Sequence, residues 1–109
     1  MAASEADGNA TALTAGGGET TLSTLTSAGT YQFSADLSVL SGSDILEIRI
    51  YTKIRSGGTS RVAWMGVYGP RSTDDQNIYS PPLMCPNEFK VTATLTGTNR
   101  TLTWAIVKP

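Results

Sequence analysis

The chain has 109 residues, which is the size of a single domain with one hydrophobic core. Hydrophobic residues make up 39 % of it and the formal net charge is −1, so the composition is that of a folded domain and excludes the strongly basic surface of a typical nucleic-acid-binding protein. No apolar run approaches the roughly 20 residues of a membrane-spanning helix, and residues 1–10 lack the basic and apolar regions of a secretory signal.

Charge is divided unevenly along the chain. Residues 1–48 carry six acidic residues and no Lys or Arg, a net charge of −6, whereas residues 49–109 carry eight basic and three acidic residues, a net charge of +5. Two interpretations are open. Either strands from the two halves neutralise each other within one fold, or the acidic part meets a basic surface on another copy of the chain or on another protein.

Residues 1–18 show neither the period of a strand nor that of a helix. They consist mainly of Ala, Gly, Thr, Ser and acidic residues, with Leu13 the only large aliphatic residue after Met1. Such a segment buries too little apolar surface to order itself, so we expect a flexible N-terminal arm. The arm is either a loose terminus or a segment that becomes ordered on a neighbour in an assembly.

Alternation of apolar and polar residues, which is typical of β-strands, begins after this arm. Strands are predicted at residues 20–25 and 30–37. The strongest pattern covers residues 44–68, where two alternating runs flank Ser56-Gly57-Gly58-Thr59. We predict a β-hairpin there, because paired glycines adopt the positive φ values that a tight turn requires.

The two runs of this hairpin each predict one buried and one solvated face. The inward set is Leu46, Ile48, Ile50, Thr52 and Ile54 on the first run, with Val62, Trp64 and Tyr68 on the second. The outward set is Glu47, Arg49, Tyr51, Lys53 and Arg55 on the first run, with Arg61, Met65 and Val67 on the second.

The last third of the chain completes an all-β pattern. Residues 69–77 are polar and predict a surface loop, and three prolines between residues 81 and 86 place that segment at a sheet edge or in a crossing loop. Residues 88–96 and 101–107 are predicted strands, with Trp104 facing inward. We therefore predict an antiparallel β-sandwich or small jelly roll over residues 19–109, with a flexible N-terminal arm over residues 1–18.

The sequence offers little to catalysis or to metal binding. It contains no histidine, which removes the commonest general base and the commonest metal ligand. Cys85, the only cysteine, is interpreted as a small buried residue. Asp74 and Asp75 form the only adjacent carboxylate pair, and a solvated loop tip is favoured there over a calcium site. We predict no enzymatic activity, no metal and no cofactor.

A polar patch is the main candidate for binding. Tyr51 lies on the outward register among basic residues, and Tyr and Arg are enriched at the centres of protein interfaces. An ordinary solvated sheet face and a stacking platform for a sugar remain alternatives. The candidate interface residues are Glu5, Asp7 and Leu13 of the arm, with Arg49, Tyr51, Lys53, Arg55 and Arg61.

Five motifs follow one another along the chain: G-T-Y-x-F-x-x-D-L from Gly29, D-I-L-E-I-R-I-Y-T-K from Asp44, S-G-G-T-x-R from Ser56, S-P-P from Ser80 and T-W-A-I from Thr103. In these motifs the chain resembles the small virion proteins of tailed bacteriophages. The resemblance covers about three quarters of the chain and leaves out residues 1–18.

This resemblance implies a capsid decoration (cement) protein, synthesised in the host cytoplasm and located on the capsid surface of the virion. Its partner is then the major capsid protein, and a homo-oligomer, with a trimer favoured, suits the local three-fold positions of a shell. No nucleic acid and no membrane is implied as a partner. The alternative is a tail- or fibre-associated module that binds carbohydrate or a host surface through Tyr51, Tyr68 or Tyr79. A small hydrolase is disfavoured by the missing histidine.

Overall fold

The computed structural model describes residues 4–70 and 76–109, and within them the chain forms nine β-strands and no helix. The strands are β1 (Ser4–Leu13), β2 (Thr20–Leu25), β3 (Gly29–Asp36), β4 (Ile45–Thr52), β5 (Arg61–Tyr68), β6 (Asn77–Tyr79), β7 (Leu83–Cys85), β8 (Phe89–Thr96) and β9 (Arg100–Lys108).

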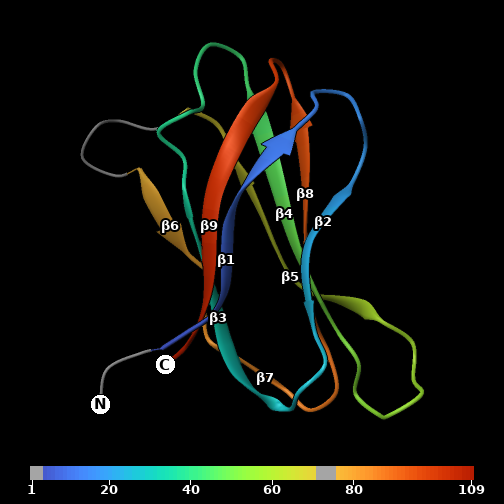
Figure 1. Cartoon of the computed structure of the whole chain (residues 1–109). Helices are drawn as coiled ribbons and strands as arrows, with labels where there is room; N and C mark the ends of the chain where they lie inside the picture. Colours follow the sequence, from blue (N-terminus) through green and yellow to red (C-terminus); the bar gives the residue numbers. More distant parts are fainter. Residues whose placement is uncertain (1–3, 71–75) are drawn as a thin grey trace.

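The strands form two antiparallel sheets that pack face to face (Figure 1). Sheet A has the order β1-β9-β3, with β6 and β7 paired to successive parts of β3, and sheet B has the order β2-β8-β4-β5. The prediction of an antiparallel β-sandwich is therefore confirmed. The proline-rich segment lies at a sheet edge, as predicted. There the backbone N–H of Phe33 donates a hydrogen bond to the Ser80 hydroxyl at 3.0 Å instead of to a backbone carbonyl of a neighbouring strand.

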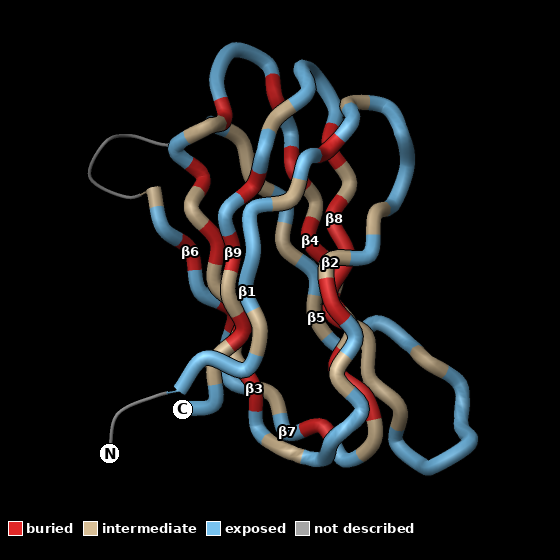
Figure 2. The backbone as a smooth tube through the Cα atoms, viewed as in Figure 1, coloured by how far each residue is buried: buried red, intermediate tan, exposed pale blue. Residues whose placement is uncertain are grey.

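The core lies between the two sheets, where alternate residues of both point inward (Figure 2). Aromatic rings pack within it: Phe33 and Trp104, on neighbouring strands of sheet A, stack with centroids 6.4 Å apart, and Tyr31 of sheet A contacts Phe89 of sheet B with tilted rings 5.2 Å apart. Cys85 is fully buried and its burial raises the pKa of the thiol, which agrees with a packing role.

The predicted hairpin of residues 44–68 is present as β4 and β5, but two of its residues were assigned to the core wrongly. Ile54 is 82 % exposed because β4 ends at Thr52 and the connection to β5 runs through residues 53–60. Val62 is 46 % exposed because a bulge shifts the register: Ile50 pairs with Trp64 but Tyr51 pairs with Val62. A bulge of one residue turns the following side chain to the other face.

The N-terminal segment also differs from the prediction. Residues 4–13, expected to belong to a flexible arm, form β1 and pair with β9 along their whole length, so the sandwich includes them. Leu13 is buried, the Trp104 indole N–H donates to the Thr11 hydroxyl at 2.9 Å, and the Ser23 hydroxyl donates to Asp7 at 2.5 Å. These side-chain bonds and the backbone hydrogen bonds to β9 hold β1 in place, although β1 itself buries little apolar surface.

Core packing on β4 yields a direct stability test. We predict that Ile50→Ala lowers the free energy of unfolding by about 2–5 kcal/mol, because Ile50 is fully buried. The matched control is Ile54→Ala, which removes the same atoms from an exposed side chain and should change stability by less than about 0.5 kcal/mol. Equal effects in chemical denaturation would contradict this assignment of the core.

The buried carboxylate of Asp44 joins the connections at one end of the sandwich. It accepts hydrogen bonds from the backbone N–H groups of Ser41 at 3.0 Å and Thr98 at 2.9 Å, and from the Arg100 side chain at 2.8 Å. These bonds, with that from Ser41 contributing most, hold the pKa of Asp44 below its usual range despite burial.

The lowered pKa of Asp44 makes its contribution to stability depend on pH. A carboxyl with a depressed pKa in the folded state stabilises the fold above its unfolded pKa of about 4, and this contribution is lost as the pH falls further. We predict that Asp44→Asn destabilises the fold at pH 7 and that the difference from the wild type shrinks as the pH falls below about 4. Denaturation curves at several pH values test this, and a difference that does not change with pH would contradict it.

Candidate protein-interaction surface

The outer face of sheet B combines apolar, aromatic and basic side chains. We define the β4–β5 face as these outward side chains of its last two strands: Glu47, Arg49, Tyr51, Val62, Met65 and Val67, with Arg49 ion-paired to Glu47 at 2.5 Å. The register brings them together, because Arg49 pairs with Met65, Tyr51 with Val62, and Glu47 with Val67. Paired residues of antiparallel strands project from the same side of a sheet.

The apolar part of this face lies along β5. Val62, Met65 and Val67 are 46 %, 51 % and 56 % exposed. The inward residues Trp64 and Tyr68 approach each other over Gly66, where any Cβ would lie within 2.8 Å of both rings. β5 is also an edge strand, because β4 is its only neighbour in sheet B within the described residues. It therefore presents both apolar side chains and unpaired backbone groups to a partner.

The polar part of the face is held in place by its neighbours. The Tyr51 hydroxyl donates to Glu19 at 2.6 Å, the Thr92 hydroxyl donates to the same carboxylate, and the Lys90 ammonium lies 4.6 Å from the centre of the Tyr51 ring. The bonds from Thr92 and Tyr51 lower the pKa of Glu19. Tyr51 is thus fixed in one orientation before a partner arrives, which reduces the ordering cost of binding.

The connection between β4 and β5 extends the face with basic residues. Arg55 and Arg61 are exposed, and together with Ile54 and Val62 they line a hollow of about 490 Å³. Figure 1 shows the connection projecting from the end of the sandwich. Lys53 lies beside it, 3.7 Å from Glu88. Of the five predicted interface residues of this region, Arg49 and Tyr51 lie on the β4–β5 face, Arg55 and Arg61 line this hollow, and Lys53 lies beside Glu88. The outward position predicted for Arg61 is wrong, because the bulge pairs it with Thr52, on the opposite register from Tyr51.

The three predicted interface residues of the N-terminal segment lie elsewhere. Leu13 is only 3 % exposed and belongs to the core, so it is not available to a partner. Asp7 is half-buried and bonded to Ser23, while Glu5 is exposed on the outer side of β1. The acidic N-terminal part and the basic C-terminal part of the chain also contact each other within the fold, since Asp44 forms an ion pair with Arg100 at 2.8 Å.

The apolar strip of β5 was missed by the sequence analysis as a binding feature. The signal was present, because β5 carries apolar residues on both of its registers, whereas a strand with one solvated face alternates apolar with polar residues. The bulge then added Val62 to the outer face.

Among the residues that the structure describes, no group of three or more His, Cys, Asp or Glu side chains is placed to bind a metal ion. Asp74 and Asp75, the pair weighed as a calcium loop, lie outside the described residues. No helix suited to crossing a membrane occurs in the part of the chain that is described.

Comparison of the chain with protein-family models, with curated proteins and with solved structures found no significant match.

Proposed function

We propose that this chain is a non-enzymatic structural protein of a tailed bacteriophage, namely a capsid decoration protein that binds the outer shell and stabilises the contacts between capsomers. The resemblance of its sequence motifs to small phage virion proteins supports the proposal. The observation that carries it is the exposed apolar strip of Val62, Met65 and Val67 on an edge strand, next to Arg49 and Tyr51.

The chemistry of this face suits a protein partner. Met, Tyr and Arg are enriched in the buried centres of protein interfaces. A strand of the major capsid protein that pairs with β5 would add backbone hydrogen bonds to this apolar burial.

The distribution of charge also supports association between copies. Glu5 is exposed on β1, at the edge of sheet A, while Arg55 and Arg61 lie beside β5, at the opposite edge of the sandwich. Contact between the acidic edge of one copy and the basic edge of the next is heterologous, and repetition of such a contact closes into a ring when the rotation allows. A trimer of this kind matches the local three-fold positions of a shell.

Binding to particles tests the proposal. We predict that the purified protein co-sediments with particles assembled from the major capsid protein encoded in the same genome. The double variant Met65→Lys, Val67→Lys should bind at least about tenfold more weakly, because two charges would be buried in the contact.

The control is the charge-matched variant Thr30→Lys, Thr101→Lys, which changes exposed residues of sheet A. It should bind as the wild type does. Failure of the wild-type protein to bind particles would refute the proposed function. Equal binding by both double variants would refute the assignment of the contact to the β4–β5 face.

A further inference from the structure

The outer face of sheet A carries a shallow trough that lies apart from the β4–β5 face. Its residues stand in rows set by strand register. One row runs Gly8, Ala105, Ser34 and Tyr79 across β1, β9, β3 and β6. The next row runs Ala10, Thr103, Asp36 and Asn77 across the same strands. Each row therefore begins with small side chains, the first ends at an aromatic ring, and the second ends at a carboxylate and an amide.

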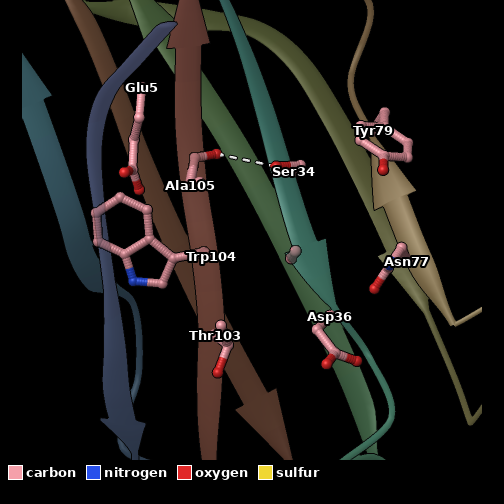
Figure 3. Close-up of a pocket in the computed structure, with 9 residues that line it drawn as sticks. Glu5, Ser34, Asp36, Asn77, Tyr79, Thr103, Trp104 and Ala105 are labelled. Atoms are coloured by element: carbon pink, nitrogen blue, oxygen red, sulfur yellow. Dashed lines mark hydrogen bonds between the residues drawn. The ribbon is translucent and has the colours of Figure 1, made fainter.

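The trough has a floor of small residues between two larger walls (Figure 3). Ser34 and Ala105 form the floor, Tyr79 rises at one side, and Glu5 reaches over Gly8 at the other. Gly8 leaves room for this position of Glu5, because a Cβ at residue 8 would lie 2.0 Å from a Glu5 carboxylate oxygen. The hollow has a volume of about 270 Å³.

Tyr79 provides an exposed apolar surface within this polar setting. Its side chain is 64 % exposed, and it lies on the short edge strand β6 beside polar residues. An exposed aromatic ring presents a flat face to a ligand at little cost in conformational entropy, since only two side-chain torsions are fixed. Tyr79 lies beside Asn77 and opposite Ser34, so a ring stacked on it would have hydrogen-bonding groups along one edge.

The polar groups beside Tyr79 can both donate and accept hydrogen bonds. Asp36 accepts the Ser38 backbone N–H at 2.9 Å, and this bond, with a smaller contribution from the Ser38 side chain, lowers the pKa of Asp36, so the carboxylate stays ionised and acts as an acceptor. The side-chain amide of Asn77 and the side-chain hydroxyl of Thr103 make no hydrogen bond to another described residue. Each offers a donor and an acceptor.

We propose that this trough is a saccharide-binding site, in which a neutral pyranose ring lies against Tyr79 while its hydroxyl groups bond to Asp36, Asn77 and Thr103. A polyol matches a lining that mixes one aromatic face with several donors and acceptors. A phosphate or another anion is opposed by the carboxylates of Asp36 and Glu5, and a purely apolar ligand would leave these groups without partners.

The site does not depend on the proposed attachment to a capsid. Because the two sheets pack face to face, the trough and the β4–β5 face point in opposite directions (Figure 1). A partner bound to sheet B leaves the trough open, so one molecule can hold a protein on one side and a glycan on the other.

Nuclear magnetic resonance of the full-length chain tests the site. The probes are maltose, cellobiose, lactose, mannobiose and diacetylchitobiose, each titrated to millimolar concentration into the ¹⁵N-labelled protein. At least one of these sugars should shift the backbone amide signals of Ser34, Asp36, Asn77 and Thr103, while the signals of β5 stay in place. The same spectra report whether each variant is folded.

The variants separate stacking from hydrogen bonding. Tyr79→Ala should weaken binding at least about tenfold, Tyr79→Phe should bind nearly as the wild type does, and Asn77→Ala should weaken binding without abolishing it. The control Val62→Ala, on the opposite face, should have no effect. The inference is overturned if no sugar of this set shifts these signals, if Tyr79→Ala binds as the wild type does, or if the shifts map to sheet B.

Discussion

The carboxylate of Asp44 connects the two sheets at one end of the sandwich, where two of the crossing connections meet. The β3–β4 connection passes from sheet A to sheet B and the β8–β9 turn passes back, and Asp44 accepts hydrogen bonds from both. Gly97 is necessary to this arrangement, because its φ is +115° and a Cβ would lie 2.3 Å from an Asp44 oxygen. One carboxylate thus fixes where β4 and β9 begin, and with them the registers of both sheets.

Those registers determine what the outer faces present. On sheet B, the pairing of β4 with β5 places Arg49 and Tyr51 next to the apolar residues of an edge strand. On sheet A, the pairing of β3 with β9 and β6 places Tyr79 at the end of a row of small residues and Asp36 next to Asn77. Neither surface is a feature of one segment, since each combines residues from strands far apart in the sequence.

The parts of the fold that follow strict alternation were predictable from the sequence. In β3, β4, β8 and β9 large apolar residues occupy every second position, and the structure buries Phe33, Ile50, Val91 and Leu102 as expected. β1 was not predictable in this way, because its outward residues include Gly8 and Ala10 and its inward ones include Asp7 and Thr11, so no contrast in polarity marks the period. β1 is held in place by hydrogen bonds to residues far away in the sequence, and the local sequence pattern carries no information about them.

The candidate surfaces were predictable only in part. The hairpin pattern placed Arg49 and Tyr51 outward correctly, but the bulge that brings Val62 to the same face depends on how β5 packs against β4. Tyr79 was considered as a stacking residue, whereas its neighbours Asp36 and Thr103 were not, because the pairing of β3 with β6 and β9 joins segments more than 40 residues apart.

Hydrogen exchange on the assembled particle tests most directly whether the β4–β5 face is the surface that binds the shell. Exchange of backbone amides would be followed by mass spectrometry for the free protein and for the protein bound to particles. We predict slower exchange in β5 and in the connection of residues 53–60 on the particle, with exchange in β6 unchanged, because a partner at this face covers the free edge of sheet B. Protection confined to sheet A, or no protection of β5 in the bound protein, would contradict the account.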